Sequence, residues 1–173
     1  MTRQRIMLIS LSAILIFGLL LGGKIIYQKQ WIDASILNQS QHIPGVVSAK
    51  TVDVNGQSEV DVITNHISNL SDVSYELKKL AGNLPIRYLD QRNNTLEQLF
   101  DQMQFPLQEG IVRGNFTEMA QNVKNLAEKA GVQLNLQMDN GAIYVVLNQG
   151  DSQLLEVLER HQQGEFLPSE KEN

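Results

Sequence analysis

An uncharged apolar run near the N-terminus constrains this chain more than any other feature of its sequence. The run extends from Ile6 to Gly23 and is 18 residues long. As a helix with a rise of about 1.5 Å per residue it would measure about 27 Å, close to the ~30 Å thickness of a bilayer's hydrocarbon core. Because the Lys24 side chain can reach the headgroups, the apolar residues that follow it can extend the span. The sequence therefore predicts a transmembrane helix over residues 6–27.

The charges on either side of the run, together with the chain's length, set the expected orientation. Arg3 and Arg5 precede the run and Lys24 and Lys29 follow it, so the charge bias is shallow. A short N-terminal tail over residues 1–5 is readily retained in the cytoplasm, and a long C-terminal part is translocated largely regardless of its charge. We expect a single-pass protein of the cell membrane with its N-terminus inside and its C-terminal domain extracytoplasmic.

A cleaved signal peptide is the alternative interpretation of the same run. The apolar region of a signal peptide is usually about 7–15 residues long and ends at an A-x-A-like site. Here the run is longer, and Gly22, Gly23 and Lys24 are followed by further apolar residues. The sequence therefore favours an uncleaved anchor.

Gly18 and Gly22 lie one helical turn apart within the predicted span. Such a pair lets a second membrane helix approach closely, which makes Gly18 and Gly22 candidates for helix packing in the bilayer. Glycine is also frequent in membrane helices in general, so the pair is open to both interpretations. The expected partners are the lipid bilayer, other membrane or envelope proteins, and a second copy of the chain.

The part beyond the span predicts an α+β fold. Residues 28–45 form a short tether, residues 46–163 one extracytoplasmic domain, and residues 164–173 a polar tail. Alternating apolar residues favour half-buried strands, and hence a two-layer domain with a mostly antiparallel sheet and helices on one face. The expected elements are two strands within 46–64, a helix over 70–81, a strand over 84–89, a helical segment from 95 that Pro106 kinks or divides, a helix over 116–130, a hairpin over 132–148 and a final helix over 152–161.

Two Asn-Gly pairs mark turns, and the phase of the apolar residues distinguishes them. At Asn140-Gly141 a two-residue turn gathers six apolar side chains on one face of the hairpin, those of residues 134, 136, 138, 143, 145 and 147. At Asn55-Gly56 the same turn would set Val52 and Val54 opposite polar residues. A longer loop of about three to five residues, which pairs Val54 with Val60, restores the match and is the prediction here.

The composition excludes several kinds of site. The chain has no cysteine, which excludes disulfides, a thiol nucleophile and a cysteine-linked lipid, and its three histidines are scattered. Net charge is −5, and beyond residue 29 ten basic residues face 19 acidic ones. Such an acidic domain suits neither nucleic acid nor anionic lipid. We predict no cofactor, no metal, no catalytic residues and no nucleic-acid partner.

Arg113, Gly114 and Asn115 form a candidate anion site. They precede a predicted helix N-terminus, where backbone N–H groups and a guanidinium suit a phosphate or carboxylate. The same residues also fit a plain loop between two helices, and they lack the Gly-Lys-Ser/Thr ending of a phosphate loop.

Carboxylates offer a second set of candidates. Glu97 and Asp101 are four residues apart and share one face of a predicted helix. Paired carboxylates can act as acid and base or hold a cation, and a solvated helix face explains the same spacing. A carboxylate-based hydrolase using Glu97, Asp101 or Asp90 is the weakest of three functional hypotheses.

The leading hypothesis is a membrane-anchored protein whose outer domain binds other proteins, as a non-catalytic subunit or scaffold of a bacterial envelope assembly. It follows from the short tether, the compact acidic domain and the lack of a catalytic motif. The second hypothesis is a membrane-anchored sensor that binds a small anionic ligand near Arg87, Arg92 or Arg113.

Overall fold

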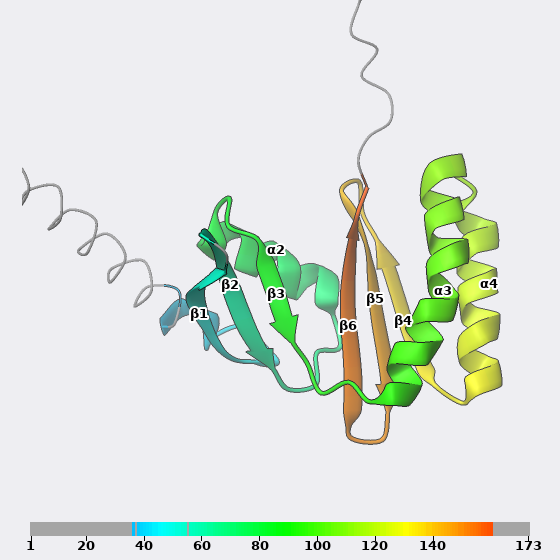
Figure 1. The fold of residues 1–173 in the computed structure, drawn as a ribbon, viewed down its shortest axis with the longest axis horizontal. Coiled ribbons are helices and arrows are strands. Elements are labelled where there is room, and N and C mark those ends of the chain that lie inside the picture. The colour runs from blue at the N-terminus through cyan, green and yellow to red at the C-terminus, as the bar shows by residue number, and fades with distance from the viewer. Residues whose placement is uncertain (1–35, 37, 55, 161–173) are drawn as a thin grey trace, which may run out of the picture.

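The computed structural model describes residues 36, 38–54 and 56–160, which form an α+β domain with two small sheets (Figure 1). Strands β1, β2 and β3 form the first sheet in that order, with β3 parallel to β2, and β4, β5 and β6 form an antiparallel second sheet. The predicted α+β class is thus confirmed. The elements are β1 (Val46–Val54), β2 (Gln57–Thr64), α2 (Leu70–Ala81), β3 (Ile86–Leu89), α3 (Asn94–Arg113), α4 (Phe116–Ala130), β4 (Gln133–Met138), β5 (Ala142–Gln149) and β6 (Ser152–Glu159).

The second sheet is covered on both faces. Helices α3 and α4 pack on one face, against Ile143 and Val145, while α2 and the first sheet lie on the other, against Tyr144 and Val146 (Figure 1). The prediction of one sheet with helices on one face is therefore wrong. Every residue from Ala142 to Leu147 is buried, and consecutive buried residues on a strand require cover on both faces.

The final helix predicted over residues 152–161 is also wrong, because residues 152–159 form strand β6. Leu154 packs in the core under α3 and α4, whereas Leu155 packs in the core against α2. A strand buried on both faces loses its period of two, and its short apolar run then resembles a helix. Gly150, with a φ of 59°, belongs to a tight turn that sets Gln149 opposite Ser152.

The two hairpins differ in how well their sequence predicts their pairing. In the β4–β5 hairpin Met138 lies opposite Ile143, as predicted. In the β1–β2 hairpin Val54 lies opposite Gln57, so the predicted longer loop is wrong. The core face of β1 is carried by Ala49, opposite Val62, and an irregularity between Val46 and Ser48 shifts the phase of the strand. Val54 consequently lies on the uncovered face of the first sheet, where it is exposed.

The predicted helix over residues 70–81 is confirmed as α2. Its buried stripe includes Leu70, Val73 and Leu77, the Asn69 side chain accepts a hydrogen bond from the Asp72 N–H, and Gly82 ends the helix. Helix α4 is confirmed as well. Helix α3 is a single helix that continues through Pro106.

Helix α3 begins at Asn94, one residue before the predicted start at residue 95, and is capped by Asn93. The Asn93 side chain accepts a hydrogen bond from the Leu96 N–H at 2.9 Å, whereas Thr95, the residue at which the sequence predicts the helix to start, is exposed within the first turn. We expect Asn93→Ala to lower the free energy of unfolding by about 1 kcal/mol, because an N-terminal N–H loses its acceptor. Thr95→Ala serves as the control and should change the free energy in urea unfolding by less than about 0.5 kcal/mol. Equal losses in the two variants would contradict this assignment.

The predicted membrane span over residues 6–27, which contains Gly18 and Gly22, lies outside the described residues. So do residues 1–5 and the tail over residues 164–173. Within the described ranges, none of the helices has the length and apolar character needed to span a bilayer.

Candidate functional site

The candidate site is a groove between β3 and β6, which are edge strands of the two sheets. It has a volume of about 540 Å³. Residues 86–90 and Arg92 line one side, and residues 155–157 line the other. We call this feature the edge groove.

At one end of the edge groove the link between β3 and α3 is bonded to β6. The Gln153 N–H donates to the Gln91 C=O at 3.1 Å, and the Leu155 N–H donates to the Asp90 carboxylate at 2.7 Å. Within the described part of the chain, no backbone hydrogen bond joins β3 itself to β6. The link after β3 and strand β6 are therefore joined at residues 90–91, and the strands β3 and β6 are unpaired beyond that join.

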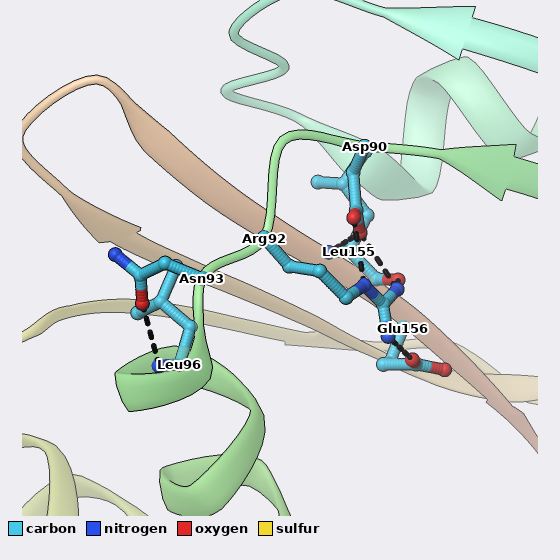
Figure 2. A network of polar contacts seen from close by, with 6 residues as sticks. All are labelled: Asp90, Arg92, Asn93, Leu96, Leu155 and Glu156. Carbon is cyan, nitrogen blue, oxygen red and sulfur yellow. Dashed lines mark hydrogen bonds and ion pairs between the residues drawn. The ribbon is translucent and has the colours of Figure 1, made fainter.

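Arg92 lies beside the join between this link and β6 (Figure 2). Its guanidinium donates to both oxygens of Asp90 at 2.7 Å and to Glu156 at 2.9 Å. The hydrogen bonds from Arg92 to Asp90, and then the two negative charges, raise the pKa of Arg92 above its ordinary value. Because the Asp90 side chain is 2% exposed and Leu155 donates to it as well, this carboxylate anchors the link to β6.

Arg87 lies on the same side of the edge groove and is also engaged by carboxylates. Its Nε and Nη2 donate to the two oxygens of Asp61 at 2.8 and 3.0 Å, and its Nη1 lies 3.0 Å from Glu59. The structure therefore brings Arg87 and Arg92, two of the predicted anion ligands, to one groove. Their guanidinium groups already bind carboxylates of the chain, with which any small anion would have to compete.

The main chain of β3 presents unpaired groups to the edge groove. The Val60 N–H donates to the Pro85 C=O at 2.8 Å. In a parallel ladder every second residue of a strand bonds to the same neighbour, so Arg87 bonds to β2 while Ile86 and Tyr88 direct their N–H and C=O groups away from it. Over the residues that the structure describes, no hydrogen bond reaches these groups of Ile86 and Tyr88.

The side chain of Tyr88 fixes this edge to the helix behind it. Its hydroxyl shares a hydrogen bond of 2.7 Å with the Ser74 hydroxyl of α2. Burial raises the pKa of the Tyr88 hydroxyl, so the side chain stays neutral at physiological pH. The edge of β3 is thus held in place while its backbone remains unpaired.

Strand β6, on the facing side of the groove, also has unpaired backbone groups beyond the join at residues 90–91. Gln153 and Leu155 direct their N–H groups away from β5, toward the link at residues 90–91. By the alternation of an antiparallel ladder, Val157 and Glu159 direct their backbone groups the same way. Among residues 36, 38–54 and 56–160, none provides a hydrogen-bond partner for the backbone groups of Val157 and Glu159 on that side.

The predicted anion site at Arg113, Gly114 and Asn115 connects α3 to α4. The Arg113 guanidinium pairs with Glu109, Gly114 ends α3 with a φ of 72°, and the Asn115 side chain donates to Glu118 at 3.0 Å. Helix α3 has 20 residues and is therefore about 30 Å long, so these residues at its C-terminal end lie far from the join at residues 90–91, which precedes its N-terminal end. Anion binding there stays a prediction.

Of the three candidate carboxylates, Glu97 and Asp101 lie outside the edge groove and Asp90 lies in it. Glu97 and Asp101 are exposed on α3, and Asp101 accepts a hydrogen bond from Gln104 at 3.4 Å. Glu156, which lies within the final helix predicted over residues 152–161, instead lines the groove on β6 and pairs with Arg92 there. No group of three histidine, aspartate or glutamate side chains in the described chain is arranged to hold a metal ion.

The edge groove therefore offers main-chain donors and acceptors, with charged side chains that neutralise one another at its base. Sequence reasoning missed it because a strand edge carries no residue signature of its own. Assigning residues 152–159 to a strand instead of a helix would have revealed a second strand edge. Comparison of the chain with protein-family models, with curated proteins and with solved structures finds no match.

Proposed function

We propose that this chain is a membrane-anchored, non-catalytic subunit of a bacterial envelope assembly whose outer domain binds an extended segment of another protein. The observation that carries this proposal is the pair of unpaired strand edges, β3 and β6, that line one groove. Proteins usually cover or blunt such edges, since an exposed edge readily pairs with another chain. An extended segment satisfies alternating N–H and C=O groups by adding a strand.

The anchor places the partner at or near the membrane. The predicted span over residues 6–27 and the tether over residues 28–45 are followed at once by β1, which starts at Val46. A tether this short keeps the edge groove close to the outer surface of the bilayer. We therefore expect the partner to be a membrane or envelope protein, with the domain on the extracytoplasmic side.

Binding of a small anion is the second candidate function, favoured by the position of Arg87 and Arg92 at the edge groove. It is the weaker candidate because both guanidinium groups donate to carboxylates of the chain. Inorganic phosphate separates the two functions. A phosphate-dependent rise in melting temperature that is lost in Arg92→Gln would favour the anion site.

The strand-addition proposal is tested by Val157→Pro. The Val157 N–H is directed away from β5, so proline removes a donor from the edge without removing a bond of the sheet. We expect the full chain in its native membranes, with a photo-crosslinking residue in place of Glu159, to form a defined adduct with a partner protein. In the Val157→Pro background this adduct should decrease at least about tenfold, since the added strand loses a hydrogen bond and meets the proline ring.

Val157→Ala is the matched control, because it shortens the side chain and keeps the N–H. It should retain the adduct, and both variants should retain the far-UV circular dichroism of the parent. The proposal is wrong if no adduct forms at residue 159, or if the adduct persists undiminished when Val157 is replaced by proline.

A further inference from the structure

The outer face of α3 carries the two most exposed large apolar side chains in the described chain. Phe105 is 84% exposed and Val112 is 64% exposed. Seven residues apart on a helix, they lie on one stripe, with Gln108 between them and Asp101 four residues before Phe105 on the same stripe. A shallow groove of about 490 Å³ lies between these side chains, and Gln104, Glu109 and Arg113 complete its lining.

We propose that this stripe of α3 pairs with the same stripe of a second copy of the chain, with the two helices antiparallel. A two-fold axis between Gln108 and Glu109 would set Phe105 of each copy against Val112 of the other. The same axis sets Gln108 opposite Glu109, an amide opposite a carboxylate. One surface that complements itself in this way is what a two-fold dimer requires.

The charges on the stripe select this orientation. Asp101 lies at one end and Arg113 at the other, and Arg113 is 70% exposed although it pairs with Glu109. In the antiparallel arrangement Asp101 of one copy faces the end of α3 that carries Arg113 of the other. A parallel pair would instead set Asp101 against Asp101, which is unfavourable.

A single helix stripe buries less than the ~1,000 Å² expected of a stable interface, so the association is weak for free domains. Anchoring both copies in one membrane raises their effective concentration without adding contacts. The pairing rests on the proposed membrane anchor but not on the edge groove, so strand addition and pairing can fail independently.

Disulfide crosslinking of the full chain in membranes tests this pairing cleanly, because the natural chain has no cysteine. Gln108→Cys lies beside the proposed axis and should form a covalent dimer on mild oxidation. Asp101→Cys lies far from the axis in the antiparallel pair and should not, whereas a parallel pair would crosslink at both positions. Lys124→Cys, exposed on α4, is the control for random collision.

Three further variants in the Gln108→Cys background, one of them a control, test the chemistry. Phe105→Ser should abolish the dimer, while Tyr75→Ser, which removes an exposed ring on α2, should leave it unchanged. Asp101→Arg should lower dimer yield about fivefold, the effect of losing favourable surface charge pairs. Crosslinking at Gln108 no greater than at Lys124, or equal at Gln108 and Asp101, would overturn the proposal.

Discussion

Gln153→Ala is expected to lower the free energy of unfolding by about 3 kcal/mol, because it leaves two buried main-chain groups without partners. Gln153 is 4% exposed in β6. Its Oε1 accepts from the Ile67 N–H at 2.8 Å, and its Nε2 donates to the Ile67 C=O at 2.9 Å. One side-chain amide thus satisfies both polar groups of a buried residue in the segment between β2 and α2.

Gln133→Ala, at an exposed position on β4, is the matched control and should change stability by less than about 0.5 kcal/mol in urea unfolding at pH 7. Gln153→Glu adds a test of mechanism. Its carboxylate keeps the acceptor but faces the Ile67 C=O, so burial and repulsion should raise the pKa of the introduced group. Stability should be present at low pH and lost as the pH rises from about 4.3, the unfolded value, through the raised folded value. A Gln153→Ala variant as stable as the control would refute the assigned role.

Local sequence predicts those elements in which two independent signals agree. In the β4–β5 hairpin the Asn140-Gly141 turn and the alternation of apolar residues require the same register, and the structure has it. In α2 the apolar stripe, the cap at Asn69 and the terminal Gly82 agree in the same way. These signals lie within a few residues of one another, so no knowledge of the tertiary fold is needed to read them.

The elements that were predicted wrongly depend on contacts far along the chain. Strand β6 is buried by α2 on one face and by α3 and α4 on the other, which removes the alternation that identifies a strand. In β1 the irregularity near Val46 shifts the alternation so that Ala49 faces the core. Val54 then lies on the exposed face, and the register predicted from it is wrong. In both cases tertiary burial, and not local preference, decides which face is apolar.

The edge groove shows the same limit for the candidate site. Arg92 reaches Glu156 across 64 residues of sequence, and the bond between them exists only because the link after β3 lies along β6. Sequence reasoning selected Arg87 and Arg92 as candidates from their charge alone. It could not show that carboxylates of the same chain bind both guanidinium groups. In the part of the chain that the structure describes, the groups of the groove that remain unpaired are those of the main chain.

Gly110→Val is expected to destabilise the domain by about 4 kcal/mol through the contact between α3 and α4. A Cβ at Gly110 would lie 2.6 Å from Sδ and 2.7 Å from Cβ and Cγ of Met119. Although Met119 has a flexible side chain, its Cβ is fixed to the backbone of α4, so rotation alone cannot relieve the overlap. The helices must therefore move apart, which disrupts the apolar contacts of the core around Met103 and Val123.

Gly110→Ala makes the sign of the effect informative. In an exposed helix interior the change from glycine to alanine would gain about 1 kcal/mol from helix propensity. Here overpacking of about 1–3 kcal/mol opposes that gain, so we expect a net loss of about 1 kcal/mol in urea unfolding. Gln102→Ala, exposed on the same helix, should be nearly neutral and controls for propensity.

The cause is isolated by adding Met119→Ala, which removes the Sδ and Cγ that the new methyl group would meet. If close approach explains the loss, Gly110→Ala should cost less in the Met119→Ala background than alone, with a coupling energy of about 1 kcal/mol or more. Gly110→Val should be rescued only in part, because the Cβ of residue 119 remains in place. Strictly additive losses would instead mean that Gly110 is required for the backbone of α3 rather than for the approach of α4.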